Sequence, residues 1–183
     1  MSDVHHLTEA EFGELLAGFE HTAFRLEVQP SYLEPSEAAL LAAFLRGDPP
    51  PATAVPELRQ WYRQVAAQAA AGKRMERVRV QQDPPTGYQR FERWLDQWNI
   101  PAGETMRYMT RKRAHKIGLL PAAEGPDWWL LDSSRLIVMR FDREGRRVSN
   151  LLVTDPETVI TACMWRDLAV HHSVRAKLSD VAA

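Results

Sequence analysis

The chain has 183 residues and a formal net charge of −1, with 45% hydrophobic and 26% charged residues. This size suits one domain with its own core, and the near-neutral charge argues against a general polyanion binder. No apolar run is long enough to cross a bilayer, and the acidic, polar first residues exclude a secretory signal. The single cysteine excludes an internal disulfide and a cysteine zinc site. We therefore expect a cytoplasmic protein with one globular domain over residues 1–183, of which 1–7 form a flexible tail.

The first half of the chain alternates helices with single strands. A capping box formed by Thr8 and Glu11 predicts a helix that continues to about residue 20. Apolar and polar residues alternate over 24–29, which predicts a half-buried strand. The further elements expected in this half are helices at 36–46 and 56–71 and a strand at 75–81.

The second half is richer in strands, and two of these have the pattern of central strands. Residues 127–132 and 135–141 are almost continuously apolar, so we expect both of their faces to be covered. The apolar stripe of the last helix is expected to include Ile160, Cys163 and Met164. The other elements expected here are helices at 86–98 and 156–178 and strands at 105–111 and 147–153.

The order of these elements predicts the fold class. Strands separated by helices favour parallel pairs, whereas the consecutive strands late in the chain favour antiparallel pairs. The prediction is an α/β fold in the mixed α+β sense, with a single mixed parallel and antiparallel sheet and helices on both faces.

A basic stretch without any acidic residue covers 107–116. Its candidate contact residues are Arg107, Arg111 and Arg113, because clustered Lys and Arg bind phosphates or acidic protein surfaces. The arginines of the strand at 75–81 are expected to point outward and to enlarge this patch. The alternative is an ordinary solvated strand end and loop.

A second candidate site combines Tyr88, Glu104, Arg107 and Tyr108. Ligands of open α/β sheets bind near the ends of strands, and Glu104 and Arg107 flank such a strand. A paired Glu and Arg would orient a small polar ligand. The alternative is an ordinary ion pair without a ligand.

A third candidate site is the apolar strand that contains Trp129 and is bracketed by Asp127 and Asp132. The two acids form either a site or a strand entry and a turn. Asp167 and His171 lie four residues apart on one helical face, but two ligands without a third seldom hold a metal. There is no phosphate-binding glycine loop and no nucleophile elbow. We therefore predict no catalytic residue, metal or cofactor.

Nearly the whole chain resembles an uncharacterised family from actinobacteria that is known only as a domain of unknown function. The resembling stretches are Ala23–Glu27, Arg77–Val80, Tyr88–Phe91, Ala102–Glu104 and Asp127–Asp132. Members of that family are often encoded beside helix-turn-helix regulators, so the resemblance implies a regulatory setting but no reaction.

The element order and the segment from Asp127 to Asp142 also resemble one half of the phospholipase D superfamily fold. That family places a His-x-Lys motif at the start of a central strand. Here Asp127 stands at the first of these positions and Trp129 at the Lys position, so the resemblance implies that the nucleophile and its phosphate-binding partner are missing.

Three functional hypotheses follow. The first is a non-catalytic regulatory or sensor domain that binds a partner protein, such as a DNA-binding regulator, or a small anionic ligand near Arg107. The second is an enzyme of phosphoryl or nucleotide chemistry that uses Glu104, Asp127 or Asp132 as acid or base. The third is a direct nucleic-acid binder through the basic stretch, against which the near-neutral charge argues. We favour the first hypothesis, and the sequence is compatible with either a monomer or a homodimer.

Overall fold

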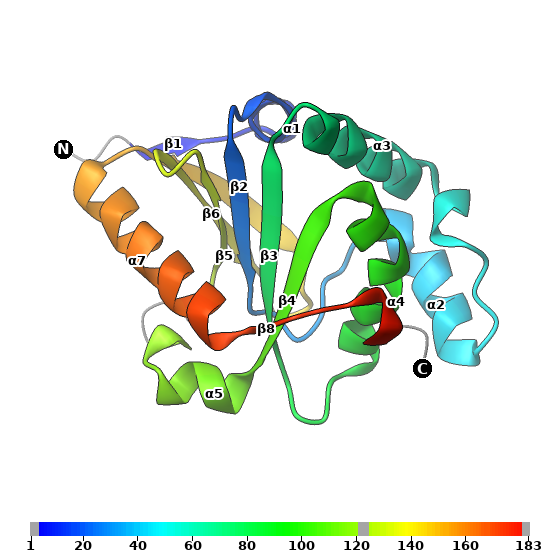
Figure 1. The fold of residues 1–183 in the computed structure, drawn as a ribbon. Helices are drawn as coiled ribbons and strands as arrows, with labels where there is room; N and C mark the ends of the chain where they lie inside the picture. Colours follow the sequence, from blue (N-terminus) through cyan, green and yellow to red (C-terminus); the bar gives the residue numbers. More distant parts are fainter. Residues whose placement is uncertain (1–3, 121–124, 181–183) are drawn as a thin grey trace.

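The computed structural model describes residues 4–120 and 125–180, in which one mixed sheet forms the centre of the molecule (Figure 1). The strand order is β1-β7-β6-β5-β2-β3-β4-β8. Strands β2, β3 and β4 run parallel, and the other neighbouring pairs are antiparallel. The predicted fold class is therefore confirmed. The strands are β1 (Val4–His6), β2 (Thr22–Glu27), β3 (Arg74–Gln81), β4 (Glu104–Thr110), β5 (Asp127–Leu131), β6 (Arg135–Phe141), β7 (Arg147–Val153) and β8 (Val174–Arg175).

Helices cover both faces of this sheet, as predicted (Figure 1). One face is covered by α1 (Glu9–Gly18) and α3 (Pro56–Ala70), together with α4 (Gly87–Ala102) and the more peripheral α2 (Ala38–Arg46). The opposite face is covered by α5 (Arg111–Lys116) and α7 (Pro156–His172). Short 3-10 helices occupy Pro35–Glu37, Ala52–Ala54 and Leu178–Asp180.

Local sequence signals set the ends of several helices. The Thr8 hydroxyl accepts a hydrogen bond from the Glu11 backbone N–H, and the Glu11 side chain accepts one in return from the Thr8 N–H, which completes the predicted capping box. Gly103 ends α4 in the left-handed region at φ 117°. A Cβ atom at this position would lie 2.7 Å from the Cβ of Ala69, so only glycine allows α4 to approach α3 this closely.

The two strands predicted to be central are indeed buried on both faces. Trp129 and Leu131 of β5 and Ile137 and Met139 of β6 are all buried and pack against α1 and α3.

We expect Leu131→Ala to lower the free energy of unfolding by about 2–5 kcal/mol, because it leaves a cavity in a closely packed core. Urea unfolding measures the change, and the exposed Met164→Ala is the control. Hydrogen exchange in β5 as fast as at the termini would contradict this assignment.

Three predictions outside the last helix differ from the structure. Residues 4–6, expected in the tail, form β1 and pair with β7, while residues 1–3 lie outside the described part. The strand at 24–29 is not half-buried, because α1, α3 and α4 cover the face that carries its charged residues. The basic stretch contains a short helix, α5, which the sequence did not indicate.

The last helix faces the core with a different side from the one predicted. Val159, Ala162 and Ala169 are the buried positions of α7, and Cys163 is only half-buried. Ile160 and Met164, expected in the core, are 60% and 67% exposed. The helix carries apolar residues on several sides, so its periodicity does not single out one face. It also ends at His172, before the predicted residue 178.

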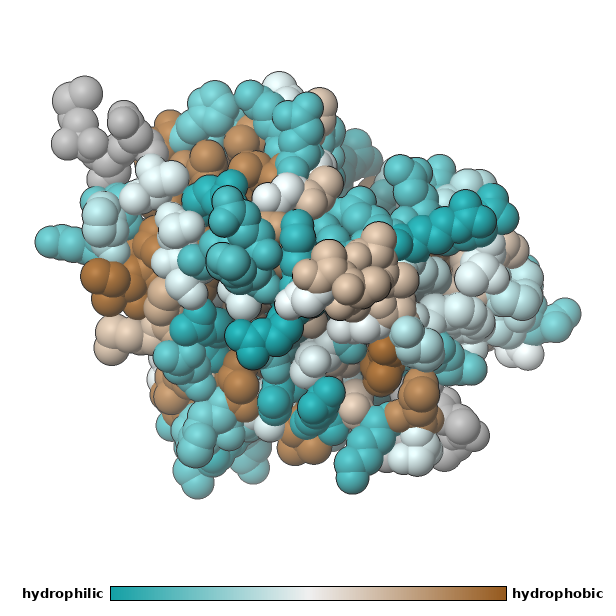
Figure 2. Space-filling view, turned by 45° about the horizontal axis from the view of Figure 1, so that its top comes forward, coloured by the Kyte–Doolittle hydropathy of each residue, from teal (hydrophilic) through white to brown (hydrophobic). Residues whose placement is uncertain are grey.

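The surface of the molecule mixes hydrophobic and hydrophilic side chains (Figure 2). Hydrophobic side chains are visible at several places in that view, and the exposed large hydrophobic residues of the described chain include Ile160 and Met164 of α7. Among the helices of residues 4–120 and 125–180, none has the length and apolar character needed to cross a membrane.

Candidate functional site

A cavity of about 240 Å³ lies between the sheet and the helices α1, α3 and α4. Strands β2 and β3 form its floor with charged side chains, and aromatic rings from several elements form much of its wall. Charged and aromatic groups that line one internal space are the usual marks of a small-molecule site. The aromatic residues of the lining are Phe12, Tyr32, Trp61, Tyr88, Trp129 and Phe141.

The register of the parallel strands gathers the charges of the floor. Arg25 of β2 lies beside Arg77 of β3, and two residues further along Glu27 lies beside Arg79. Because side chains alternate between the two faces of a strand, all four point to the cavity side. Trp129 of β5 lies beside Arg25 on its other flank. Two short charged segments far apart in the sequence thus form one polar surface.

Glu27 is the hub of this surface, because its carboxylate contacts three guanidinium groups. Its oxygens lie 2.9 Å from Arg79 Nε, 3.3 Å from Arg25 Nη1 and 3.6 Å from Arg77 Nη1. Burial alone would raise the pKa of Glu27, but the three positive charges outweigh it and lower this pKa to about 2. Glu27 is therefore ionised throughout the physiological pH range.

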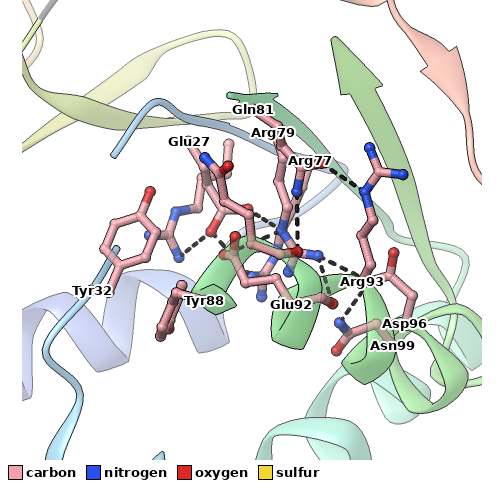
Figure 3. Close-up of polar contacts among 12 residues, drawn as sticks. Glu27, Tyr32, Arg77, Arg79, Gln81, Tyr88, Glu92, Arg93, Asp96 and Asn99 are labelled. Atoms are coloured by element: carbon pink, nitrogen blue, oxygen red, sulfur yellow. Dashed lines mark hydrogen bonds and ion pairs between the residues drawn. The ribbon is translucent and has the colours of Figure 1, made fainter. Parts of the chain in front are cut away.

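Helix α4 supplies the second layer of partners, as Figure 3 shows for Arg79. The Arg79 guanidinium donates to the Asp96 carboxylate at 3.0 Å and to the Glu92 carbonyl oxygen at 3.1 Å. Asn99 donates to the same carboxylate at 3.1 Å. These three residues of α4 are four and three positions apart, so they lie on one side of the helix and face the sheet. The polar residues of α4 are thus held by the floor of the cavity.

Glu92 differs from its neighbours because, among the described residues, its carboxylate has a single ionic contact, a long one of 3.5 Å to Arg79 Nε. Burial raises the pKa of Glu92 to about 8, since Arg79 compensates only part of the loss of hydration. One turn earlier on α4, the Tyr88 hydroxyl donates to Glu37 at 3.0 Å, and burial also raises the pKa of Glu37. We call Glu37, Tyr88 and Glu92 the acidic pole of the cavity.

The floor of the cavity contains hydrogen-bond donors without acceptors. Within the described residues, Arg25 Nε and Trp129 Nε1 are buried atoms without a hydrogen-bond partner. Unpaired buried polar atoms are costly, so a bound molecule that supplies an acceptor would be stabilised here. The cavity surroundings therefore combine protonatable carboxyl groups with buried N–H groups that lack a partner.

The mouth of the cavity is marked by its most exposed lining residues, Leu33, which is 44% exposed, and Glu34. The loop that carries them is held by a hydrogen bond from the Leu33 N–H to the Gly145 carbonyl at 2.8 Å. A Cβ atom on Gly145, which has φ 83°, would lie 2.6 Å from the Ser31 carbonyl oxygen. Glycine at this turn is thus what allows the loop to close over the cavity.

Four of the predicted site residues lie in or beside the cavity. Tyr88 and Trp129 line it. Glu104 lies beside the floor, where it pairs with Arg77 and accepts a hydrogen bond from Trp61 Nε1 at 2.6 Å. The buried Asp127 accepts hydrogen bonds from the Tyr32 hydroxyl at 2.6 Å and the Val28 N–H at 2.9 Å.

The other four predicted residues do not join them. Arg107 points to the opposite face of the sheet and pairs with Glu76 at 2.5 Å. Tyr108 donates to Asp96 beneath α4, and Arg111 donates to the Val28 carbonyl at 3.1 Å. Arg113 lies at a different groove, beside His172. The arginines of β3, Arg77 and Arg79, were expected to enlarge this basic patch, and that expectation is wrong because their face is covered.

The residues that the sequence analysis missed are Arg25, Glu27, Tyr32, Arg79 and Glu92. A signal for these residues exists in the sequences of two strands. In β2, the oppositely charged Arg25 and Glu27 stand two residues apart, and in β3 the two arginines Arg77 and Arg79 stand at the same spacing. Without the strand order, the same pattern indicates solvent-facing positions. The second signal would have been the polar residues Glu92, Asp96 and Asn99, whose spacing places them on one side of α4.

The remaining candidates have structural roles. Asp132, at the opposite end of β5 from Asp127, accepts hydrogen bonds from the backbone N–H groups of Glu20, His21 and Thr22. Partial burial would raise the pKa of Asp132, but these hydrogen bonds lower it to about 2. In the described part of the chain, no three His, Cys, Asp or Glu side chains are grouped so that they could hold a metal.

Comparisons with known proteins place the fold and the family. The structure is similar to NucT from Helicobacter pylori, with a TM-score of 0.52, 10% identity and coverage of 96% of this chain and 99% of that one. It is also similar to Nuc, a phospholipase D family member from Salmonella typhimurium, with a TM-score of 0.54, 9% identity and coverage of 97% and 98%. At these identities the likeness shows the fold alone. No curated protein matches the chain. The model of the family described as Domain of unknown function (DUF6879) matches residues 10–177, and the chain belongs to this family.

Proposed function

We propose that this chain is a non-catalytic sensor domain that binds a small molecule in the cavity beneath α1, α3 and α4. The observation that carries the proposal is the composition of the cavity lining. It combines aromatic rings, arginines and glutamates, and within the described residues it includes no His, Lys, Ser, Thr or Cys. The two lining tyrosines, Tyr32 and Tyr88, have pKa values raised by burial, so they are poor nucleophiles. The lining thus offers groups for recognition, and its possible nucleophiles are limited to carboxylates.

The charges around the cavity indicate the class of ligand. The three floor arginines are surrounded by five carboxyl groups, and four carboxyl groups remain when Glu92, with its pKa of about 8, is protonated at pH 7. The five are Glu27, Glu92, Asp96, Glu104 and Asp127. This balance argues against an anion in the cavity, in contrast to the small anionic ligand expected near Arg107. A positively charged nitrogen group at the acidic pole would compensate Glu92 and lie against the ring of Tyr88.

The unpaired donors of the floor complete the description of the ligand. Arg25 Nε and Trp129 Nε1 require an acceptor, such as a carbonyl or carboxylate oxygen. We infer a small molecule that carries both a cationic nitrogen group and an oxygen acceptor. The volume of about 240 Å³ lies below the roughly 300–1,000 Å³ of drug-sized sites, which limits the ligand to a small metabolite.

A sensor domain acts through a protein that recognises its liganded state, so the proposal includes a partner protein. A cytoplasmic DNA-binding regulator that recognises the liganded state would give the domain a role in transcription regulation. The family resemblance to proteins encoded beside helix-turn-helix regulators supports this partner. Direct binding to nucleic acid is less favoured, because Arg107 already pairs with Glu76 and Arg111 already donates to the Val28 carbonyl.

Capture of the ligand from a metabolite extract tests the proposal. The purified chain is incubated with extract and washed, and the released small molecules are identified by mass spectrometry. We expect wild type and Val148→Trp, a control on an exposed residue outside the cavity, to retain the same molecule. Leu33→Trp should lose it, because the larger side chain blocks the mouth. Equal retention by all three proteins, or retention by none, would contradict the proposal.

Because the lining has no His, Lys, Ser, Thr or Cys among the described residues, we predict that the chain does not hydrolyse phosphodiesters. With bis-p-nitrophenyl phosphate as substrate, we expect no release of nitrophenol above the buffer rate. Asp127→Asn is the informative variant, since Asp127 was the candidate acid or base of the enzyme hypothesis. Turnover by wild type that Asp127→Asn abolishes would favour the enzyme over the sensor.

A further inference from the structure

A second concave site lies outside the cavity, in a groove of about 550 Å³ between α4, α5 and β8. Three arginines reach it from three different elements: Arg93 from α4, Arg113 from α5 and Arg175 from β8. Figure 1 shows how β8 crosses beside β4 and continues from the end of α7, which places the last of these arginines at the edge of the sheet. The fold therefore gathers positive charges from distant parts of the sequence.

Two of these arginines are positioned by neutral groups. Arg93 Nε donates to the Gln81 side-chain oxygen at 2.6 Å, and its guanidinium lies 4.5 Å from the centre of the Tyr108 ring. Arg113 donates to His172 Nδ1 at 2.8 Å, which requires that ring nitrogen to be an unprotonated acceptor. Arg175 is exposed on β8, and within the described residues none of the three arginines forms an ion pair with a carboxylate. The charges of all three arginines thus stay available.

The groove has few negative charges of its own. Its two acidic residues are Asp83 and Asp96, and Asp96 is already paired with Arg79 on its buried side. Among the described residues, three guanidinium groups therefore line the groove together with one carboxylate that has no ionic partner, that of Asp83. Between them, Met109, Tyr108 and the exposed Val174 provide an apolar surface.

We propose that this groove binds a phosphoryl group of a small molecule through Arg93, Arg113 and Arg175. Guanidinium groups offer paired N–H donors that match two oxygens of a phosphate, and such charge-assisted bonds are among the strongest in proteins. The apolar surface beside them would contact the remainder of a larger ligand, such as a nucleoside. This site is independent of the cavity, which has the opposite charge balance.

Calorimetric titration with two probes at low salt tests the groove. Inorganic pyrophosphate supplies the phosphoryl groups alone, and ADP adds a nucleoside. We expect wild type to bind both, and the double variant Arg113→Gln/Arg175→Gln to bind both at least tenfold more weakly. Tighter binding of ADP than of pyrophosphate would identify a nucleotide as the ligand class, and equal binding would identify the phosphate chain. Both results support the phosphoryl site.

The control variant removes two positive charges from a surface outside the groove. Arg59 and Arg63 are exposed on α3 and line neither the cavity nor the groove. Arg59→Gln/Arg63→Gln should bind both probes within twofold of wild type, and Leu33→Trp should do the same because the cavity is a separate site. If the two double variants weaken binding equally, the effect is general surface charge and the proposal is wrong. It is also wrong if wild type binds neither probe.

Discussion

Glu27→Gln is expected to lower the free energy of unfolding by about 3–5 kcal/mol, the range for removing one partner of a buried ion pair. Glutamine keeps the shape of the side chain but removes the charge that Arg25, Arg77 and Arg79 share. Other carboxylates contact each arginine, yet none of them contacts all three. The change should appear in urea unfolding as a lower midpoint with an unchanged slope.

The control for this variant is Glu14→Gln on the exposed side of α1, which should change the free energy of unfolding by less than about 0.5 kcal/mol. A loss below about 1 kcal/mol for Glu27→Gln would mean that the remaining carboxylates suffice to compensate the three arginines. The central role given to Glu27 would then be wrong.

Glu92→Gln is expected to remove much of the pH dependence of stability between about pH 5 and pH 8. The pKa of Glu92 is raised from 4.5 to about 8 in the folded chain, so within this interval the folded form binds more protons than the unfolded form. The free energy of unfolding therefore falls as pH rises, by up to about 1.4 kcal/mol per pH unit for one such group. Glutamine does not ionise, so the variant loses this slope.

Unfolding curves of wild type and Glu92→Gln at several pH values between 5 and 8.5 measure the difference. The pKa values of Glu37, Glu104 and Asp127 are also raised by burial and add a slope of the same sign to both proteins. Only the difference between the two curves reports on Glu92. We expect the variant to be the more stable protein at pH 8 by a few kcal/mol, and parallel curves would show that Glu92 titrates normally.

The fold was largely predictable because its signals are local. The capping box at Thr8 and the glycine at Gly47 set helix ends where expected. The apolar runs at 127–132 and 135–141 marked the central strands. The short α5 and the face of α7 escaped prediction because one has six residues and the other is apolar on several sides.

The site was less predictable, because it depends on which strands become neighbours. Arg25 and Arg77 are far apart in the sequence, and only the pairing of β2 with β3 places them side by side. Tyr88 was found from its helix, whereas Glu92 on the same helix was not, since a lone glutamate on a helix usually faces solvent. Burial of charges requires partners, and partners come from tertiary structure.

The central claim is that a cation binds beside Glu92 and ionises it. Calorimetric titration of the captured molecule at pH 7, in two buffers with different ionisation enthalpies, measures the protons exchanged on binding. We predict that wild type releases close to one proton per ligand, about 0.9 for a group with a pKa near 8, and that Glu92→Gln releases almost none. Uptake of protons by wild type, or equal release by both proteins, would contradict the claim.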